Sequence, residues 1–499
     1  MRRTALLLAA TLAAPAMAAP PKVPSAAAEA QVLELSKQAI ALRSVRGKDN
    51  KTGDVARLYK SALLGAGWSD KDIEITPVDD TVYLVATWQG SDPKLKPLII
   101  SGHMDVVEAN PKDWTRDPFT PVVENGYLFG RGASDQKVSM ILAMVGLMEL
   151  RKAGWQPKRT IVIAFSGDEE TTMKTGRILA DRFAGAEMVL NTDGIGGSYE
   201  EASGKPLFWT WEGAEKTYLD VKLEVTNPGG HSSAPRPENA ITQLATAVQR
   251  VGNYTFTAEQ SPLTKAYFEK AAQFEGDPKL AAAMRAFAAN PQDQAALATL
   301  RASPSYVGKV GTTCVPTLIS GGHAENALPQ RATANVNCRI FPGHKREEII
   351  AELARVANVP EVKFSDFTGG DAIESDASPM RSDFLTAVEK AMAAAWPKVP
   401  LIPAQSSGAT DSMWYRAKGV PAYSVSPLFI KDSDEYSHGL NERIALNNIR
   451  PGLTFYYSLM PSLATEAAPS HRGQGRRLQL PSARGARGTV PATDRQPAR

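Results

Sequence analysis

The chain has 499 residues, of which 43% are hydrophobic and 22% are charged, and its formal net charge is +3. These values are ordinary for soluble globular proteins, and they exclude a disordered, a collagen-like or a disulfide-scaffold protein. The length predicts two to three domains. The positive charge comes from the two ends of the chain, so the remaining body is mildly acidic. This charge distribution argues against nucleic acid as a partner.

The N-terminus has the three parts of an export signal. Arg2 and Arg3 form a basic start, and an apolar run rich in Leu and Ala covers Thr4–Ala14. Ala16-Met17-Ala18 has the small-x-small form of a signal-peptidase site. We therefore expect residues 1–18 to be a Sec-type signal peptide and the mature protein to be periplasmic or secreted. A buried N-terminal helix is the alternative. No later apolar run is long enough to span a bilayer, so no membrane span is expected after cleavage.

An α/β pattern follows the leader. An amphipathic helix is predicted from Glu29 to Arg43, and a second, more apolar helix covers Gln136–Ala153. Short apolar runs read as buried strands, and helical patterns separate them. Strands that alternate with helices predict a mostly parallel sheet that is buried on both faces. The predicted strands are Pro97–Ser101, Arg159–Phe165, Met188–Leu190 and Val420–Val425.

The pattern changes near Trp211. Thr217–Val225 alternates between apolar and polar residues, as expected of a half-exposed strand, and a helix follows over Asn239–Val251. An Ala-rich helical stretch covers 260–302, and two more alternating strands surround Val315 and Val336. We therefore expect a catalytic α/β domain in two parts with an α+β domain inserted between them. The predicted ranges are 19–212 and 342–463 for the catalytic domain, 213–341 for the insertion, and 464–499 for an Arg-, Pro- and Gly-rich tail too poor in apolar residues to fold.

Cys314 and Cys338 are the only two cysteines, too few for a disulfide framework or a thiolate zinc cluster. They lie on two β-like runs joined by Gly321-Gly322, so a hairpin would place the two sulfur atoms opposite each other. Export permits a disulfide between them. Two free buried thiols are equally compatible with the sequence.

Acidic residues and histidines follow the predicted strands directly. His103 ends the first strand, the pair Glu169-Glu170 ends the second, and Asp193 ends the third. Asp135 opens the apolar helix, and His438 lies in a loop before the last helix. Ligands of open α/β sheets bind at the carboxyl ends of the strands, so we expect these side chains to converge there.

Two histidines with several carboxylates suit two closely spaced divalent cations that share one carboxylate. Such a pair deprotonates a bridging water and stabilises charge on a carbonyl oxygen. A further carboxylate must then carry the proton to the leaving amine. Glu169 and Glu170 are adjacent and point different ways, so one can bind metal while the other acts as the base. Asp105 falls on the same side of the chain as His103 and can orient its imidazole. Taken singly, each residue could also be a surface charge, a helix cap or a turn residue.

The ordered motifs HMDVV, GRGASDQK, SGDEE, NTDG, GGHSSAP and SHG resemble the M20 family of dinuclear zinc peptidases and aminoacylases, over about residues 30–460. The runs GYLFGRGASDQK, PKRTIVIAFSGDEE and NPGGHSSAP are most similar to the branch of carboxypeptidase S and N-acyl-amino-acid hydrolases. The resemblance implies a zinc-exopeptidase-like α/β fold, with a mostly parallel mixed sheet flanked by helices and an inserted α+β lid or dimerisation domain.

The resemblance also implies a ligand set for two Zn²⁺ ions, in whose place Co²⁺ or Mn²⁺ could serve. One ion would take His103, Asp135 and Asp193. The other would take Asp135, Glu170 and His438, so that Asp135 bridges the pair. The general acid/base is expected to be Glu169, and the carboxylate that orients the first imidazole is expected to be Asp105.

Four further residues match substrate-contacting positions of the family. His231 matches a lid histidine that holds the scissile carbonyl oxygen, and in dimeric relatives it arrives from the partner subunit. Asn326 and Arg339 match other lid residues, and Arg suits bidentate binding of a carboxylate. Gly408 matches a Gly-rich loop that lines the substrate site. From the residues alone, His231 could be a turn residue and Arg339 a surface charge.

The expected function is therefore hydrolysis of an amide bond next to a free carboxylate, by an exported carboxypeptidase or N-acyl-amino-acid hydrolase. Closure of the lid is expected to bring His231, Asn326 and Arg339 to the substrate and to exclude water. A dipeptidase or a narrow deacylase of the same family is the alternative, and an inactive relative that only binds peptides is a further one. The expected partner is a small peptide or N-acyl amino acid, and a homodimer through the lid is left open.

Overall fold

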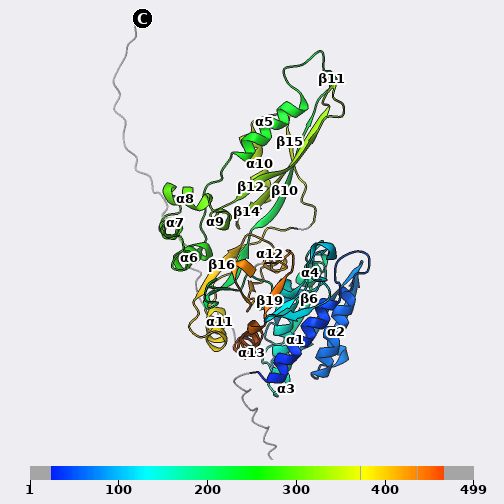
Figure 1. Ribbon diagram of the computed structural model, residues 1–499, viewed down its shortest axis with the longest axis vertical. Helices are drawn as coiled ribbons and strands as arrows, with labels where there is room; N and C mark the ends of the chain where they lie inside the picture. Colours follow the sequence, from blue (N-terminus) through cyan, green and yellow to red (C-terminus); the bar gives the residue numbers. More distant parts are fainter. Residues whose placement is uncertain (1–23, 371, 435, 466–499) are drawn as a thin grey trace, which may run out of the picture. The chain divides into compact units, whose positions relative to one another are not determined.

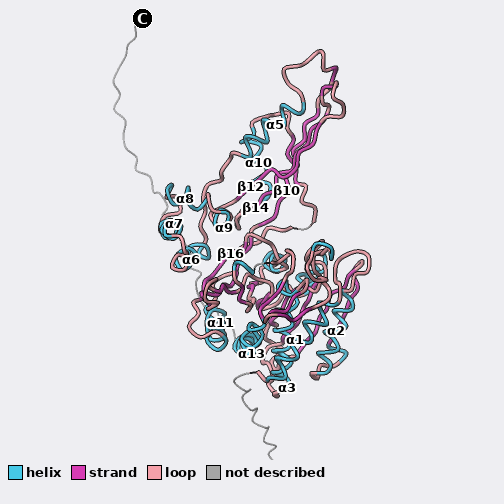
Figure 2. Tube along the Cα trace, viewed as in Figure 1, coloured by secondary structure: helices cyan, strands magenta, loops and turns pink. Residues whose placement is uncertain are grey.

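The computed structural model describes residues 24–370, 372–434 and 436–465 (Figures 1 and 2). The predicted signal peptide lies outside the described residues. So does the predicted tail, apart from Ala464 and Thr465, which end a helix. None of the helices in the described ranges combines the length and the apolar character needed to cross a membrane.

A ten-stranded mixed sheet runs through the larger part of the chain, in the order β1-β2-β6-β3-β7-β17-β9-β8-β18, with β16 beside β9. Its centre is parallel: β3 (Leu98–His103) lies between β6 (Ile161–Ser166) and β7 (Met188–Asn191), and β17 (Ala422–Ser424) continues beyond β7. All residues of these four strands are buried, which explains their continuous apolar runs. The predicted α/β class is thus confirmed. The other strands are β1 (Ile73–Val78), β2 (Thr81–Trp88), β8 (Gly197–Tyr199), β9 (Pro206–Glu215), β16 (Leu401–Ser406) and β18 (Phe429–Ile430).

Helices cover both faces of this sheet. Neighbouring residues of β3 point to opposite sides, since Ile100 belongs to one apolar core and Ile99 to another. The first core contains the apolar helix α3 (Val138–Lys152), which packs between α1 (Ala26–Ala41) and α13 (Ile449–Thr465). The remaining helices are α2 (Thr52–Gly65) and α11 (Ser382–Ala395) on the side of the first core, and α4 (Lys174–Arg182) and α12 (Ser412–Ala417) on the side of the second.

The inserted part is a four-stranded antiparallel sheet in the order β12-β14-β10-β15. In β10 (Thr217–Thr226) alternate residues are fully buried, as the alternating pattern predicts. These residues share a core with two helices, α5 (Ala240–Gly252) and α10 (Arg346–Ala357). The predicted end of the insertion at residue 341 is too early, because α10 and β15 (Lys363–Asp366) belong to this sheet and its helical cover. The other strands are β12 (Thr313–Gly321) and β14 (Arg331–Ile340), with β11 (Gly230–His231) and β13 (Ala327–Leu328) paired beyond them.

The Ala-rich stretch forms three helices, as its pattern indicates. They are α6 (Pro262–Ala271), α7 (Pro278–Ala289) and α8 (Gln294–Arg301), followed by the short α9 (Pro304–Val307). These helices build a core of their own and pack on β16 of the large sheet through Ile402. This part of the predicted insertion is therefore attached to the large sheet.

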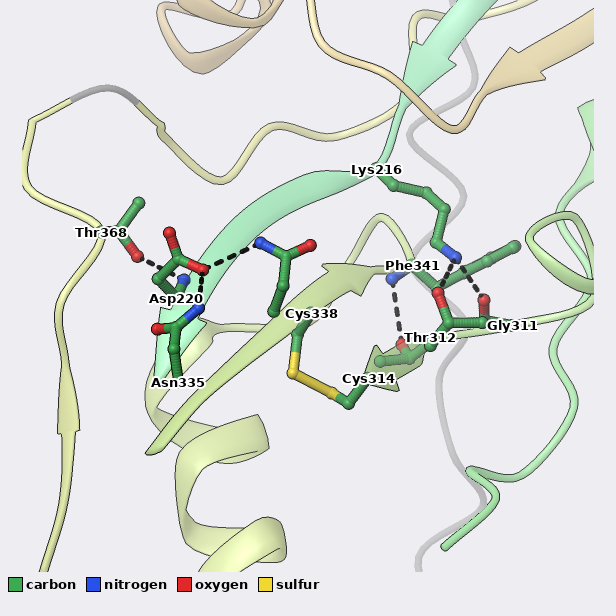
Figure 3. The surroundings of a disulfide bond; sticks show 11 residues. Lys216, Asp220, Gly311, Thr312, Cys314, Asn335, Cys338, Phe341 and Thr368 are labelled. Atoms are coloured by element: carbon green, nitrogen blue, oxygen red, sulfur yellow. Dashed lines mark hydrogen bonds between the residues drawn. A yellow bond between two sulfur atoms is a disulfide. The ribbon is translucent and has the colours of Figure 1, made fainter. Parts of the chain in front are cut away.

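A disulfide closes one end of the inserted sheet, and a buried lysine lies at the junction between the two sheets (Figure 3). Cys314 and Cys338 are register partners on β12 and β14, and they form a disulfide, which resolves the two alternatives left by the sequence. Lys216 is the single residue between β9 and β10, and its buried Nζ donates to the carbonyl oxygens of Gly308 and Gly311. The junction is thereby tied to the segment that leads into β12. The remaining short strands, β4 (Val122–Glu124), β5 (Tyr127–Phe129) and β19 (Arg443–Ala445), form a small sheet of their own.

Candidate active site

His103 ends β3 and points into the carboxyl edge of the large sheet. Its side chain is 2% exposed, and its Nδ1 lies 3.0 Å from the backbone oxygen of Asp105. A proton on Nδ1 that is donated to this carbonyl leaves Nε2 as the ligand atom. That Nε2 lies 3.2 Å from Oδ1 of Asp135 and 3.8 Å from Oδ2 of Asp193.

Asp135 lies between the two histidines. Its Oδ1 faces His103, and its Oδ2 lies 3.1 Å from Nε2 of His438. The same nitrogen of His438 lies 3.0 Å from Oε1 of Glu170. His103, Asp135 and Glu170 each offer one ligand atom within 4.8 Å of the others. The two oxygens of one carboxylate thus face two separate groups of ligand atoms, which is the geometry of a bridging ligand.

The carboxylates of this cluster outnumber the protein cations paired with them. Within the described ranges, no Lys or Arg lies within 4.0 Å of Asp135, Glu170 or Asp193, whose only ionic partners are His103 and His438. Hydrogen bonds to Asp135 and Glu170 raise the pKa of His438 to about 10. Burial raises the pKa of Asp193 well above its usual range, and the charge of Asp135 adds to this shift. Divalent cations fit such a set, because imidazole and carboxylate ligands release their protons to metal.

Asp105 holds the histidine and the acidic pair in one arrangement. It is 2% exposed, and its two carboxylate oxygens accept the backbone N–H groups of Glu169 at 3.2 Å and Glu170 at 3.0 Å. The imidazole of His103 also contacts it, with Nδ1 3.6 Å from Oδ1. Burial raises the pKa of Glu169 well above its usual range. A carboxyl group with a raised pKa is suited to taking up and releasing a proton near neutral pH.

Two charged residues without an expected role tie the loops of the site together. Glu442 is fully buried and accepts hydrogen bonds from Nη1 of Arg131 at 2.7 Å and from the backbone N–H of Gly132 and Asp135, each at 3.0 Å. Arg131 in turn donates through Nη2 to the backbone oxygen of His438 at 3.3 Å. The pair therefore fixes Asp135 and His438 relative to each other. Both residues lie within four positions of a site residue, which is the only sequence signal that could have found them.

Two hollows open from the site. The Arg339 pocket is lined by Tyr218, Asp220, Arg339 and Gly408 together with Glu169, Glu170 and His438. The Glu212 pocket is lined by Ile195, Glu212, Leu428 and Ile430 together with the same three residues and with Asp135 and Asp193. The guanidinium of Arg339 lies 4.7 Å from the centre of the Tyr218 ring and forms no ion pair with a carboxylate of the described residues. Arg339 can therefore receive an anionic group that enters this pocket.

His231 and Asn326 lie elsewhere. His231 is exposed on β11, and the backbone N–H of Ser232 beside it donates to the backbone oxygen of Asn326 at 3.0 Å. Both residues lie beyond the Arg331 end of β14, whereas Arg339 is near its other end. The eight steps between Arg331 and Arg339 span about 26 Å of extended strand. His231 and Asn326 therefore lie at the opposite end of β14 from Arg339.

The chain matches the model of peptidase family M20/M25/M40 over residues 99–462, and it belongs to this family. It is 29% identical over 393 residues to a probable carboxypeptidase S-like 2 of Dictyostelium discoideum, covering 76% of this chain and 73% of that protein. It is 26% identical over 403 residues to an N-fatty-acyl-amino acid synthase/hydrolase of Homo sapiens, covering 77% of each. The fold is similar to that of an M20 family metallo-carboxypeptidase from Sulfolobus solfataricus, with a TM-score of 0.65, 17% identity and coverage of 86% of this chain and 98% of that one. The family and these relatives support an enzyme with hydrolase activity.

Proposed function

We propose that this chain is an exported two-zinc hydrolase that cleaves an amide bond next to a free carboxylate. The observation that carries the proposal is the position of Asp135, whose two oxygens face His103 and His438 separately. The substrate would be a peptide C-terminus or an N-acyl amino acid, since the relatives include a probable carboxypeptidase and an N-fatty-acyl-amino acid hydrolase.

The ligand atoms divide into two groups. His103, Asp135 and Asp193 would hold one zinc ion, and Asp135, Glu170 and His438 would hold the other. When bound, the two ions supply Lewis acidity and lower the pKa of a coordinated water. Asp105 fixes the proton of the first imidazole and the backbone of the acidic pair.

Glu169 and Arg339 would act on the substrate directly. Glu169 lines both hollows and forms no ion pair with a Lys or Arg among the described residues, so its carboxylate can accept a proton and return it to the leaving amine. Arg339 would bind the terminal carboxylate, and Gly408 leaves that part of the pocket open because it has no side chain.

The function is tested by a hydrolysis screen of the zinc-loaded protein that pairs N-acyl amino acids and dipeptides with their C-terminal amides. The proposal predicts turnover of the free acids and little turnover of the amides. No hydrolysis of either free acid would overturn the activity. Equal turnover of acids and amides would remove the role given to Arg339.

Export is part of the proposal. It is supported by the signal-like residues 1–18 and by the Cys314–Cys338 disulfide, because disulfides persist in oxidising compartments. N-terminal sequencing of protein from the medium or the periplasm of a bacterial host should begin at Ala19. A cytosolic product that keeps Met1 would contradict this part.

A second copy of the chain would supply His231 and Asn326. Their distance from Arg339 along β14 supports this arrangement, and so does the free edge of β12, where Leu318 is 70% and Ile319 is 66% exposed. Mixing the Glu169→Gln and His231→Ala variants tests this arrangement. In a hybrid dimer, the site on the His231→Ala chain would keep its own Glu169 and receive His231 from the partner, so one of the two sites would be intact. Random mixing should restore about a quarter of wild-type activity if the sites are shared across a two-fold dimer. No recovery from a mixture shown to exchange subunits would refute the sharing.

A further inference from the structure

Glu212 is a buried carboxylate whose partner is missing from the described part of the chain. It lies on β9 and is 4% exposed. Its Oε2 accepts only a long hydrogen bond, 3.4 Å, from the backbone N–H of Ile195, and its Oε1 has no hydrogen-bond partner among the described residues. By contrast, Glu215 on the same strand is paired with Nη2 of Arg416 at 2.6 Å. Buried carboxylates are normally paired, so Glu212 calls for a donor from outside the chain.

The position of Glu212 shows where that donor would come from. Glu212 lines the hollow that also contains Asp135, Asp193 and Glu169. A nearby lysine, Lys309, acts on the charge of Glu212 but forms no ion pair with it among the described residues, and its ammonium lies 5.1 Å from the centre of the Tyr267 ring. The Glu212 side chain therefore belongs to the wall of the active-site hollow, beside the space that a bound substrate would fill.

The arrangement of the two hollows indicates which half of the substrate would lie beside Glu212. The Arg339 pocket and the Glu212 pocket share the wall formed by Glu169, Glu170 and His438. When a terminal carboxylate meets Arg339, the scissile carbonyl lies at the shared wall. The acyl half of the substrate then extends into the Glu212 pocket.

We infer that Glu212 is a specificity residue that binds an ammonium group on the acyl half of the substrate. The enzyme would therefore prefer peptides with a free α-amine to N-acyl amino acids with a plain hydrocarbon acyl chain. This inference rests on the proposed function and narrows its substrate class. A cation paired with a buried carboxylate forms a strong, charge-assisted hydrogen bond, whereas a hydrocarbon would leave the carboxylate buried and unpaired.

The test compares two substrates that differ only in the amine: alanyl-phenylalanine and propionyl-phenylalanine. Wild-type protein should cleave the alanyl compound with a kcat/KM about 10- to 100-fold higher, as expected for a buried hydrogen bond to a charged group. In Glu212→Gln this preference should fall to within about threefold of unity, through loss on the alanyl compound alone. Glu361→Gln removes an exposed acid on the lid and should keep the wild-type ratio.

Each outcome separates the inference from the function on which it rests. Unchanged turnover of the propionyl compound shows that Glu212→Gln is folded and loaded with metal. Wild-type protein that favours the propionyl compound, or a ratio unchanged by Glu212→Gln, overturns the inference and leaves the hydrolase intact. If wild-type protein cleaves neither compound, the proposed function itself fails.

Discussion

Removal of Glu442 should weaken metal binding although this residue is not a metal ligand. Its carboxylate is fully buried and accepts from Arg131, from the backbone of Gly132 and Asp135, and from both the backbone N–H and the hydroxyl of Ser134. Arg131 is itself only 3% exposed at its side chain, so Glu442→Ala leaves a buried guanidinium without its partner. Breaking a buried ion pair in this way costs about 3–5 kcal/mol.

Glu442→Ala should also disturb the metal ligands Asp135 and His438. With Glu442 absent, the turn that carries Asp135 and the loop that carries His438 lose their common anchor, and changes of this kind lower metal affinity by about 10- to 100-fold. Urea unfolding measures the first effect, and competition for zinc with a chromogenic chelator measures the second.

Glu187→Ala is a matched control. Glu187 accepts a hydrogen bond of 2.6 Å from Arg381, and this pair is not part of the site. It should lower stability and leave zinc affinity unchanged. If Glu442→Ala binds zinc as tightly as Glu187→Ala does, the reasoning is refuted.

Three further substitutions test separate parts of the account. Glu169→Gln should lower kcat by about 10²- to 10⁴-fold with no change in bound zinc, and near-wild-type turnover would exclude Glu169 as the proton carrier. Arg339→Gln should lower kcat/KM for free acids by about 10- to 100-fold while leaving C-terminal amides unaffected, and an equal loss on both would show that Arg339 does not bind the carboxylate. Cys314→Ser opens a disulfide whose cysteines are 24 residues apart. It should destabilise the protein by about 2–4 kcal/mol in a melting experiment, whereas an unchanged melt would show that the bond does not contribute.

The elements that carry the site were predictable from local patterns. Ile99 and Ile100 lie in a fully apolar run because β3 is covered on both faces, and His103 follows at the strand end where ligands bind. The regular alternation of β10 likewise reflects one buried and one open face. Such patterns depend only on neighbours in the sequence.

The parts that were missed depend on distant partners. Arg131 and Glu442 are 311 positions apart, and no local pattern indicates that they form an ion pair. Glu212 reads as an ordinary strand residue within an aromatic run, and only the fold shows that it is buried without a partner. β15 is short and polar, so its pairing with β10, more than a hundred residues earlier, gave no periodic signal. The separation of His231 from Arg339 also follows from strand register, which the motifs do not specify.

Asp135 is proposed to bridge two metal ions, and anomalous diffraction from crystals of the zinc-loaded protein would locate both ions. Two peaks are expected, one beside His103 and Asp193 and the other beside Glu170 and His438, with Asp135 contacting both. A single peak, or a second peak that does not involve His438, would contradict it.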